Sequence, residues 1–356
     1  MITKLSLSNF RCFKELSLSE LKPITIFTGG NGVGKSTILE SLLLFFSRNN
    51  PNVFDSLNAL RGLQQVYQLP SNQWEPLFWE KKTNMPMIID IVWNGDKETL
   101  VIEKDDTISI NEYNDKKIVL DVKVQPVIVP GNNYPLKITY RTKEKETPFY
   151  IALSDGYSQQ YSPQPIASES RIIDFISRRT ILNAAEMMTY IKDHGLLDRL
   201  ITHLRLLDSR ITDVYLGAEA GGMLDIRVNL GSFSGVSISY LGDGIIKLFR
   251  IILTLLTTAK SIVLIDEIEN GFHHSRLLDI WKVIAKIADD NGSQIFATTH
   301  SYECLENAAK LQIEDHESFS RLFQFIRLER KDGQIVPYIY GADSFSFAVE
   351  NNWEVR

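Results

Sequence analysis

The segment around residue 30 constrains the fold more than any other part of this sequence. An apolar run, ITIFT at 24–28, is followed by the glycine-rich stretch GGNGVGKS at 29–36. Residues 36–47 (STILESLLLFFS) then carry apolar side chains at helical spacing, with a charge only at Glu40. The order of strand, glycine-rich turn and helix indicates an α/β fold built around this turn.

A turn of this composition is suited to binding phosphate groups. Its backbone amides can surround phosphate oxygens because few side chains intervene, and the following helix adds its positive N-terminal end. Lys35 would neutralise the β- and γ-phosphates, and the hydroxyl of Ser36 would ligate magnesium. The predicted nucleotide-binding residues of this segment are Gly29, Asn31, Gly32, Val33, Gly34, Lys35, Ser36 and Thr37.

The rest of the chain divides into a β-rich stretch and a stretch of alternating helices and strands. Strands are expected at 2–8, 14–18 and 24–28, several more within 87–151, and others near 211–216, 223–230 and 234–239. We expect a loop at 154–170 and a helical block at 181–208. The last third predicts helices at 244–258, 274–289 and 301–311, strands at 261–265, 293–298, 321–329 and 334–340, and a short final helix. This alternation favours a mixed sheet with helices on both faces.

The bulk composition excludes several classes of protein. The 356 residues carry a formal net charge of −6, so the molecule as a whole does not attract nucleic acid. Two cysteines, Cys12 and Cys304, cannot make a disulfide framework or a four-cysteine zinc site. No run approaches the ~18 apolar residues of a membrane span, and the N-terminus does not resemble a signal peptide. We therefore expect a cytoplasmic protein that does not enter a membrane.

Two further motifs lie at the ends of apolar strands in the last third. IVLI at 262–265 is followed by Asp266 and Glu267, at the carboxyl edge where open α/β sheets bind ligands. Asp266 would hold magnesium through water, and Glu267 would polarise the attacking water. FATT at 296–299 precedes His300, which we interpret as a sensor of the γ-phosphate. Each motif taken alone is also compatible with an ordinary solvated turn.

A second glycine-rich segment, SYLGDG at 239–244, directly precedes the helix 244–258. Ser239, Gly242 and Gly244 at a helix start would form another anion site. One chain does not need two phosphate cradles for one nucleotide, whereas two chains packed head to tail do. A capped helix with a flexible entry is the alternative interpretation.

These motifs, in this order, resemble those of the ABC-class ATPases of the SMC, RecF and OLD group. The opening SNFRCF at 8–13 is typical of that group, and Lys35 and Asp266 are 231 positions apart (266 − 35). An AAA+ ATPase would bring its acidic pair sooner and would add an arginine finger and a sensor domain. The stretches DEIENGFH at 266–273 and QIFATTHS at 294–301, with a terminal NWEVR, are most similar to stand-alone OLD-like ATPases.

The resemblance implies an ABC-type head that binds ATP and magnesium. It divides the chain into an N-terminal part of the core (1–85), an inserted β-rich and helical lateral lobe (86–230) and a C-terminal part of the core (231–356). Ser239, Gly242 and Gly244 would be the signature that reaches the γ-phosphate of a partner subunit, although YLGDG departs from the usual LSGGQ. Asn270 and Gly271 would cross the dimer interface, and Arg11 would touch the nucleotide.

Some positions remain open within this resemblance. The glutamine of the Q-loop cannot be chosen from Gln64, Gln65, Gln68 and Gln73. His273 and His274 are adjacent, which favours a surface loop over a metal pair. The acids after position 301 are scattered, and EDHE at 314–317 is expected to be an exposed turn.

Three functions are compatible with such an ATPase. The first is a regulatory ATPase that dimerises on ATP and controls a separately encoded effector, such as a TOPRIM nuclease in phage defence, because no TOPRIM acid site follows His300. The alternative is a RecF-like repair ATPase that binds DNA. No basic run favours DNA; the densest candidates are Lys143, Lys145, Arg171, Arg178 and Arg179. A transporter motor would need a membrane partner, and the lateral lobe argues against it.

Overall fold

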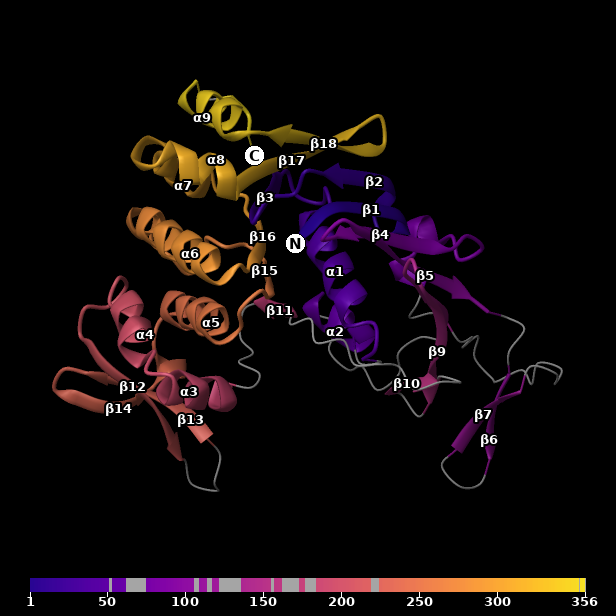
Figure 1. The fold of residues 1–356 in the computed structure, drawn as a ribbon, viewed down its shortest axis with the longest axis horizontal. Helices are drawn as coiled ribbons and strands as arrows, with labels where there is room; N and C mark the ends of the chain where they lie inside the picture. The colour runs from indigo at the N-terminus through magenta and orange to yellow at the C-terminus, as the bar shows by residue number, and fades with distance from the viewer. Residues whose placement is uncertain are drawn as a thin grey trace. The chain divides into compact units, whose positions relative to one another are not determined.

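The computed structural model of the chain is shown in Figure 1. It describes residues 1–50, 53–61, 75–105, 109–113, 117–121, 136–154, 157–161, 173–176, 184–218, 224–351 and 353–355. Two compact units are present. The first unit contains residues 1–21, 32–170 and 330–337, and the second contains residues 22–31, 171–329 and 338–356. The predicted boundaries at 85/86 and 230/231 stay a prediction.

The second unit is organised by a six-stranded sheet of order β11-β15-β16-β3-β17-β18. The neighbours β11/β15, β15/β16, β16/β3 and β3/β17 are parallel. Every residue of β3, β15 and β16 is buried, which explains why their sequences are almost continuously apolar. The bounds are Ile24–Gly29 (β3), Ile173–Ile176 (β11), Ile262–Ile265 (β15), Gln294–Thr298 (β16), Phe323–Lys331 (β17) and Gln334–Tyr340 (β18).

Helices α5, α6 and α7 lie side by side along one face of this sheet (Figure 1). Their apolar stripes form the core with the strands, and Trp281 of α6 is among the largest buried side chains. The bounds are Asp243–Thr257 (α5), Leu277–Asn291 (α6), Tyr302–Glu314 (α7), His316–Leu322 (α8) and Ala342–Glu350 (α9), with a short 3-10 turn, η4, at His274–Arg276. The predicted exposed turn at 314–317 is wrong in part. Asp315 is the N-cap of α8, and its carboxylate accepts the backbone N–H of Ser318 at 3.0 Å.

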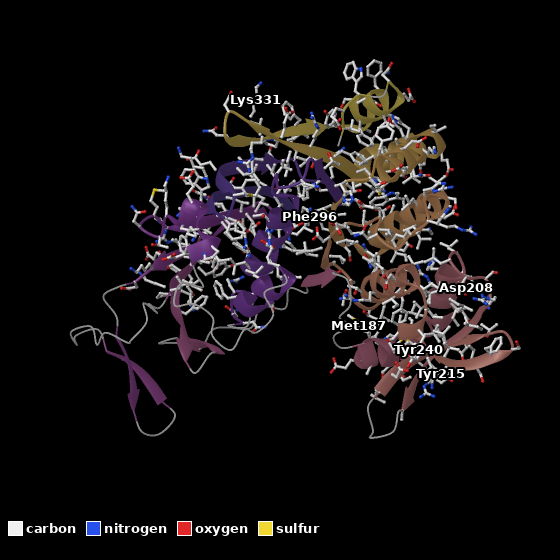
Figure 2. The ribbon with its side chains drawn as sticks, turned by 180° about the vertical axis from the view of Figure 1, so that it is seen from behind. Met187, Asp208, Tyr215, Tyr240, Phe296 and Lys331 are labelled. Carbon is white, nitrogen blue, oxygen red and sulfur yellow. The ribbon has the colours of Figure 1, made fainter. Side chains whose placement is uncertain are left out.

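A small antiparallel sheet, β12-β13-β14, belongs to the same unit. Met187 of α3 and Tyr215 of β12 mark this region in Figure 2. The predicted helical block at 181–208 is two helices, because the chain turns at 194–196 with Gly195 at φ 66°. The bounds are Ala184–Asp193 (α3), Leu197–Leu204 (α4), Ile211–Ala218 (β12), Leu224–Leu230 (β13), Phe233–Ser237 (β14) and Ile238–Tyr240 (the 3-10 turn η3).

The first unit contains a seven-stranded sheet of order β10-β9-β8-β5-β4-β1-β2, with all neighbours antiparallel. Helix α1 packs on it through Phe45, whose ring centroid lies 6.0 Å from that of Tyr140 in β8. The strands are Ile2–Phe10 (β1), Phe13–Ser19 (β2), Met87–Trp93 (β4), Asp96–Lys104 (β5), Leu136–Arg141 (β8), Glu146–Ser154 (β9) and Tyr157–Tyr161 (β10). Strands Ser109–Tyr113 (β6) and Lys117–Asp121 (β7) form a separate pair. The helices are Lys35–Phe46 (α1) and Val53–Leu60 (α2), with 3-10 turns at Glu75–Leu77 (η1) and Trp79–Lys81 (η2).

The predicted α/β class with a β-rich lobe is confirmed, and one local prediction is wrong. The loop expected at 154–170 contains β10 at 157–161, because YSQQY pairs with the end of β9. The remaining positions 155–156 and 162–170 of that loop lie outside the described residues. Among the residues that the structure describes, no helix is long and apolar enough to cross a membrane.

Candidate active site

The glycine-rich loop connects β3 to α1. Residues 29–31 belong to the second unit and residues 32–36 to the first. Gly29, Gly32 and Gly34 have positive φ angles, which only glycine adopts without strain. Helix α1 begins at Lys35 with Gly34 as N-cap and no side-chain cap, so the positive end of the helix directly follows the glycine-rich loop.

Gly34 is also required by packing. A Cβ atom there would lie 2.5 Å from Cζ of Phe13 and 2.7 Å from Sγ of Cys12. The turn between β1 and β2 therefore lies directly against the start of α1. Burial raises the pKa of the Cys12 thiol above its usual value, so this thiol is largely protonated at neutral pH.

Glu40 is a buried acid on the otherwise apolar helix α1, and two arginines pair with it. Nε of Arg11 lies 2.7 Å from one carboxylate oxygen, and Nε of Arg61 lies 2.7 Å from the other. Arg61 also donates to Oγ1 of Thr37 at 3.0 Å. Burial lowers the pKa of Arg11, and the charge of Glu40 opposes that shift. The ion pair with Glu40 holds Arg11 beside the first turns of α1. Its predicted contact with the nucleotide stays a prediction.

Sequence reasoning did not find Arg61 and assigned no role to Glu40. One signal was present, since Glu40 is the only charge in an apolar helical segment. A buried carboxylate needs a positively charged partner. The sequence could therefore have predicted that basic residues pair with Glu40, but not which ones.

The other motifs meet at the carboxyl edge of the second unit's sheet. Strands β15, β16 and β3 are parallel neighbours, so the residues that follow them emerge at the same edge. The backbone N–H of Thr299 donates to the carbonyl of Phe27 at 3.0 Å, which ties the end of β16 to β3. Asp266, Glu267 and His300 follow these strands, as the sequence predicted.

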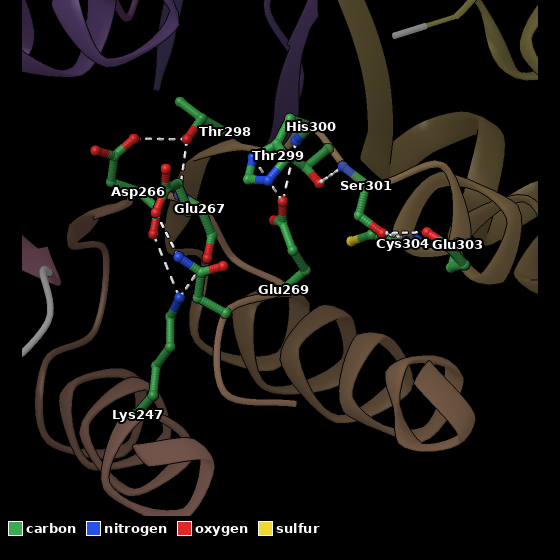
Figure 3. Close-up of polar contacts among 11 residues, drawn as sticks. Lys247, Asp266, Glu267, Glu269, Thr298, Thr299, His300, Ser301, Glu303 and Cys304 are labelled. Carbon is green, nitrogen blue, oxygen red and sulfur yellow. Dashed lines mark hydrogen bonds and ion pairs between the residues drawn. The ribbon is translucent and has the colours of Figure 1, made fainter. Parts of the chain in front are cut away.

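Thr298 joins the two acids (Figure 3). Its hydroxyl donates to Oδ1 of Asp266 at 2.6 Å and accepts the backbone N–H of Glu267 at 2.8 Å. Glu267 has φ 47°, an uncommon conformation for a side-chain-bearing residue. Its carboxylate accepts a short hydrogen bond from the side chain of Asn270, and its carbonyl accepts the backbone N–H of Asn270 at 2.9 Å. Hydrogen bonds to both the carboxylate and the carbonyl of Glu267 therefore stabilise its left-handed conformation.

Lys247 of α5 lies below this turn (Figure 3). Its ammonium donates to the carbonyl of Glu267 at 2.5 Å and to that of Asp266 at 3.3 Å. Burial lowers the pKa of Lys247 to about 8, although the negative charges of Glu269, Asp266 and Glu267 oppose that shift. Sequence reasoning did not find this residue; a lysine within the apolar helical run 245–256 was the available signal.

His300 is held by Glu269. Oε1 of Glu269 accepts the backbone N–H of His300 at 3.0 Å and lies 3.1 Å from Nδ1 of its ring. The side chain of Glu269 is 10% exposed, whereas that of His300 is 51% exposed. The sequence predicted His300 but gave Glu269 no role.

The signature segment begins α5. Ser239 and Gly242 are exposed, and Gly242 is the N-cap without a side-chain cap. Gly244 is buried, and a Cβ there would lie 2.3 Å from the carbonyl oxygen of Gly271. The start of α5 and the turn after Asp266 therefore touch backbone to backbone. Tyr240, labelled in Figure 2, is 86% exposed.

Several other predicted positions can be placed. His273 and His274 are exposed, as predicted, but His274 begins the 3-10 turn η4 and His273 is its N-cap; their ring centroids lie 4.2 Å apart. Within the described residues there is no group of three His, Cys, Asp or Glu side chains suited to a metal. Lys143 forms a short ion pair with Asp96. The four glutamines considered for the Q-loop, and Arg171, Arg178 and Arg179, lie outside the described residues.

Comparison with known proteins identifies the family. Residues 1–198, more than half of the chain, match the family model described as "AAA ATPase domain". The chain belongs to this AAA ATPase family. Residues 161–306 also match a model described as "AAA domain, putative AbiEii toxin, Type IV TA system".

Two similar proteins cover nearly the whole AAA ATPase chain. A Helicobacter pylori protein named "ATP/GTP phosphatase" is 22% identical over 385 residues, which is 99% of this chain and 98% of that protein. A solved SMC head, bound to the C-winged helix domain of ScpA, is 13% identical and covers 96% of this chain and 97% of its own, with a TM-score of 0.50. The latter likeness shows the fold.

The prediction of an ATP-hydrolysing enzyme is confirmed. The chain is an ATPase that uses ATP, and its fold is similar to that of an SMC head. The family description uses the term AAA, while the SMC-head fold is the ABC-like form that the long separation of Lys35 and Asp266 predicted.

Proposed function

We propose that this chain is a cytoplasmic, OLD-like regulatory ATPase that dimerises head to tail on ATP and controls a separately encoded effector. The observation that carries this proposal is the exposed start of α5. Gly242 leaves the helix uncapped by any side chain, and Ser239 lies in the exposed approach to it. Helix N-termini of this kind favour phosphate.

Within one chain, we propose the following roles. Residues 29–37 bind the phosphates, with Lys35 neutralising the β- and γ-phosphates. Glu267 polarises the attacking water and His300 senses the γ-phosphate. The hydrogen bonds that Thr298 and Asn270 make around Glu267 support this assignment, because they fix its backbone and its carboxylate.

Magnesium fits the residue types that are present. Asp266 offers a carboxylate oriented by Thr298, and Ser36 offers a hydroxyl; hard oxygen ligands of this kind suit Mg²⁺. When bound, the ion would offset the negative charge of the phosphates. Removal of magnesium with EDTA should stop hydrolysis, and turnover that persists in EDTA would contradict this assignment.

A single chain that binds the phosphates of one nucleotide with residues 29–37 does not need the second anion site at residues 239–244. A head-to-tail pair gives residues 239–244 the γ-phosphate of the partner's nucleotide, so each active site is shared. The close approach of Gly244 to Gly271 supports this arrangement, because it links the signature to the turn that holds Glu267. Asn270 lies on the same turn.

Mixing two inactive chains tests the shared site. One chain carries Lys35→Ala, which removes the cation of the phosphate loop. The other carries Ser239→Arg and Gly242→Arg, which the structure tolerates because both positions are exposed and no atom lies within 4 Å of a Cβ at Gly242. Each chain alone should be inactive, and the mixture should regain at most about half of the activity per mixed dimer.

Two results would contradict the proposal. Normal hydrolysis by the double-arginine chain alone would remove the signature assignment. Absence of recovery, with both chains folded and associated, would show that the sites are not shared. Calorimetry of Lys35→Ala is the separate check of the phosphate loop, since unchanged ATP affinity would exclude it.

We further propose that the effector acts in phage defence, with a TOPRIM-type nuclease as the specific hypothesis. The match of residues 161–306 to a family described as "AAA domain, putative AbiEii toxin, Type IV TA system" supports a role of this chain in such a system. Affinity purification from the native host should recover the product of a neighbouring effector gene in an ATP-dependent manner. Recovery of DNA instead, with no protein partner, would favour the RecF-like alternative.

A further inference from the structure

Glu269 makes two contacts with His300 through a single oxygen atom. Oε1 accepts the backbone N–H of His300 at 3.0 Å and lies 3.1 Å from Nδ1 of the imidazole ring (Figure 3). Among the residues that the structure describes, none hydrogen-bonds to Nε2 of this ring. Glu269 therefore fixes both the backbone and the ring orientation of the residue.

Titratable groups of the site lie around Glu269. The charge of Glu269 opposes the lowering of the pKa of Lys247 that burial causes. The charge of Glu269 in turn contributes to raising the pKa of the buried Cys304 thiol, second to burial itself. Oε1 already accepts the backbone N–H of His300, and a carboxylate oxygen is an acceptor, so in its contact with Nδ1 the ring is the donor.

We propose that Glu269 is a positioning residue that holds a proton on Nδ1 of His300 and thereby presents Nε2 to the nucleotide. In the neutral ring this selects one tautomer out of two. Nε2 donates to a phosphate oxygen when the ring takes up a second proton there, and the contact of Nδ1–H with Glu269 is compatible with that imidazolium. Glu269 does not touch the reacting atoms. This inference rests on the proposed catalytic role of His300 and deepens it.

The tautomer can be measured without any activity assay. The full-length protein, labelled with ¹⁵N at its six histidines, is observed by long-range ¹H–¹⁵N correlation at about pH 8, where ordinary imidazoles are neutral. His300→Asn assigns the His300 signals by their loss. We expect a protonated Nδ1 in the wild type, and a shift toward protonated Nε2 in Glu269→Ala. A wild-type ring protonated on Nε2, or a tautomer unchanged in Glu269→Ala, would overturn the proposal.

Kinetics provide the second readout through a double-mutant cycle. Glu269→Ala should lower kcat on the order of 10- to 100-fold, as for carboxylates that orient histidine ligands, with little change in KM. In a His300→Ala background the same change should cost nothing further, because the residue to be positioned is gone. A full additional loss in that background would assign Glu269 a merely structural role and overturn the proposal.

Two controls separate this inference from the proposed function. Glu306→Ala removes a half-buried acid of α7 that pairs with Lys310 and should leave kcat unchanged. Normal turnover by His300→Ala would refute the catalytic role of His300 while leaving the tautomer result intact.

Discussion

Replacing Gly244 by alanine tests the close approach between the start of α5 and the turn after Asp266. The added Cβ would lie 2.3 Å from the carbonyl oxygen and 3.0 Å from the carbonyl carbon of Gly271. Real Cβ atoms keep at least 3.0 Å from such neighbours, so one backbone segment must move by about 0.7 Å (3.0 − 2.3) or more. Both neighbours are backbone, so no side-chain rotation relieves the overlap.

The cost can be estimated from overpacking in other proteins. Overpacked sites lose about 1–3 kcal/mol, and the better helix propensity of alanine returns up to about 1 kcal/mol. A net loss of about 1–2 kcal/mol lowers the ratio of folded to unfolded protein about 5- to 30-fold. Urea unfolding should therefore show a lower midpoint with an unchanged slope.

Gly242→Ala is the matched control, since it makes the same chemical change two residues earlier. Gly242 has φ −61° and no atom within 4 Å of an added Cβ. The urea midpoint of Gly242→Ala should correspond to a change in the free energy of unfolding within about 0.5 kcal/mol. The poorer capping by alanine is offset by the reduced conformational freedom of the unfolded chain. Equal midpoints for the two variants would refute the proposed backbone contact.

Three further outcomes follow from the site. Glu267→Gln should retain ATP but not hydrolyse it, and light scattering should show an ATP-stabilised dimer; near-normal turnover would place the base elsewhere. Thr298→Val should lose about 1–3 kcal/mol in urea unfolding, because Asp266 and the N–H of Glu267 lose their partner, whereas Thr298→Ser should not; equal stability of the two variants would contradict this. Burial raises the pKa of Cys304 to about 12, so iodoacetamide at about pH 8 should spare it in the folded protein and modify it in urea; mass spectrometry of native samples showing alkylated Cys304 would be inconsistent with its burial.

The sequence predicted those helices and strands whose apolar residues repeat with a single period and whose ends carry a recognisable turn or capping residue. Strand β1 and helix α1 are examples, since the first alternates apolar and polar residues and the second carries apolar residues at helical spacing. Helix α8 was missed because its start is polar and its N-cap, Asp315, resembles a turn residue. Strand β10 was missed because YSQQY owes its conformation to pairing with β9.

The sequence predicted only those site residues that come shortly after the end of an apolar strand. Asp266 and His300 carry that signal, whereas Lys247 and Glu269 do not, because their roles come from contacts between separate elements. Lys247 reaches the turn across 20 positions of sequence, and Glu269 reaches His300 across 31. No local pattern encodes such contacts. A buried charge in an apolar segment indicates that a partner exists, but not which one.

The position of β3 has a consequence for synthesis of the chain. Its two neighbours in the sheet are β16 and β17, which begin 265 and 294 residues after Gly29 (294 − 29 and 323 − 29). At about 5–20 residues per second, ribosomes need about 15–60 s to reach β17 after making β3. During that interval an apolar strand lacks both of its partners and is exposed to aggregation or to chaperones. The glycine-rich loop continues directly from β3, so its strand end is anchored only when nearly the whole chain has been made.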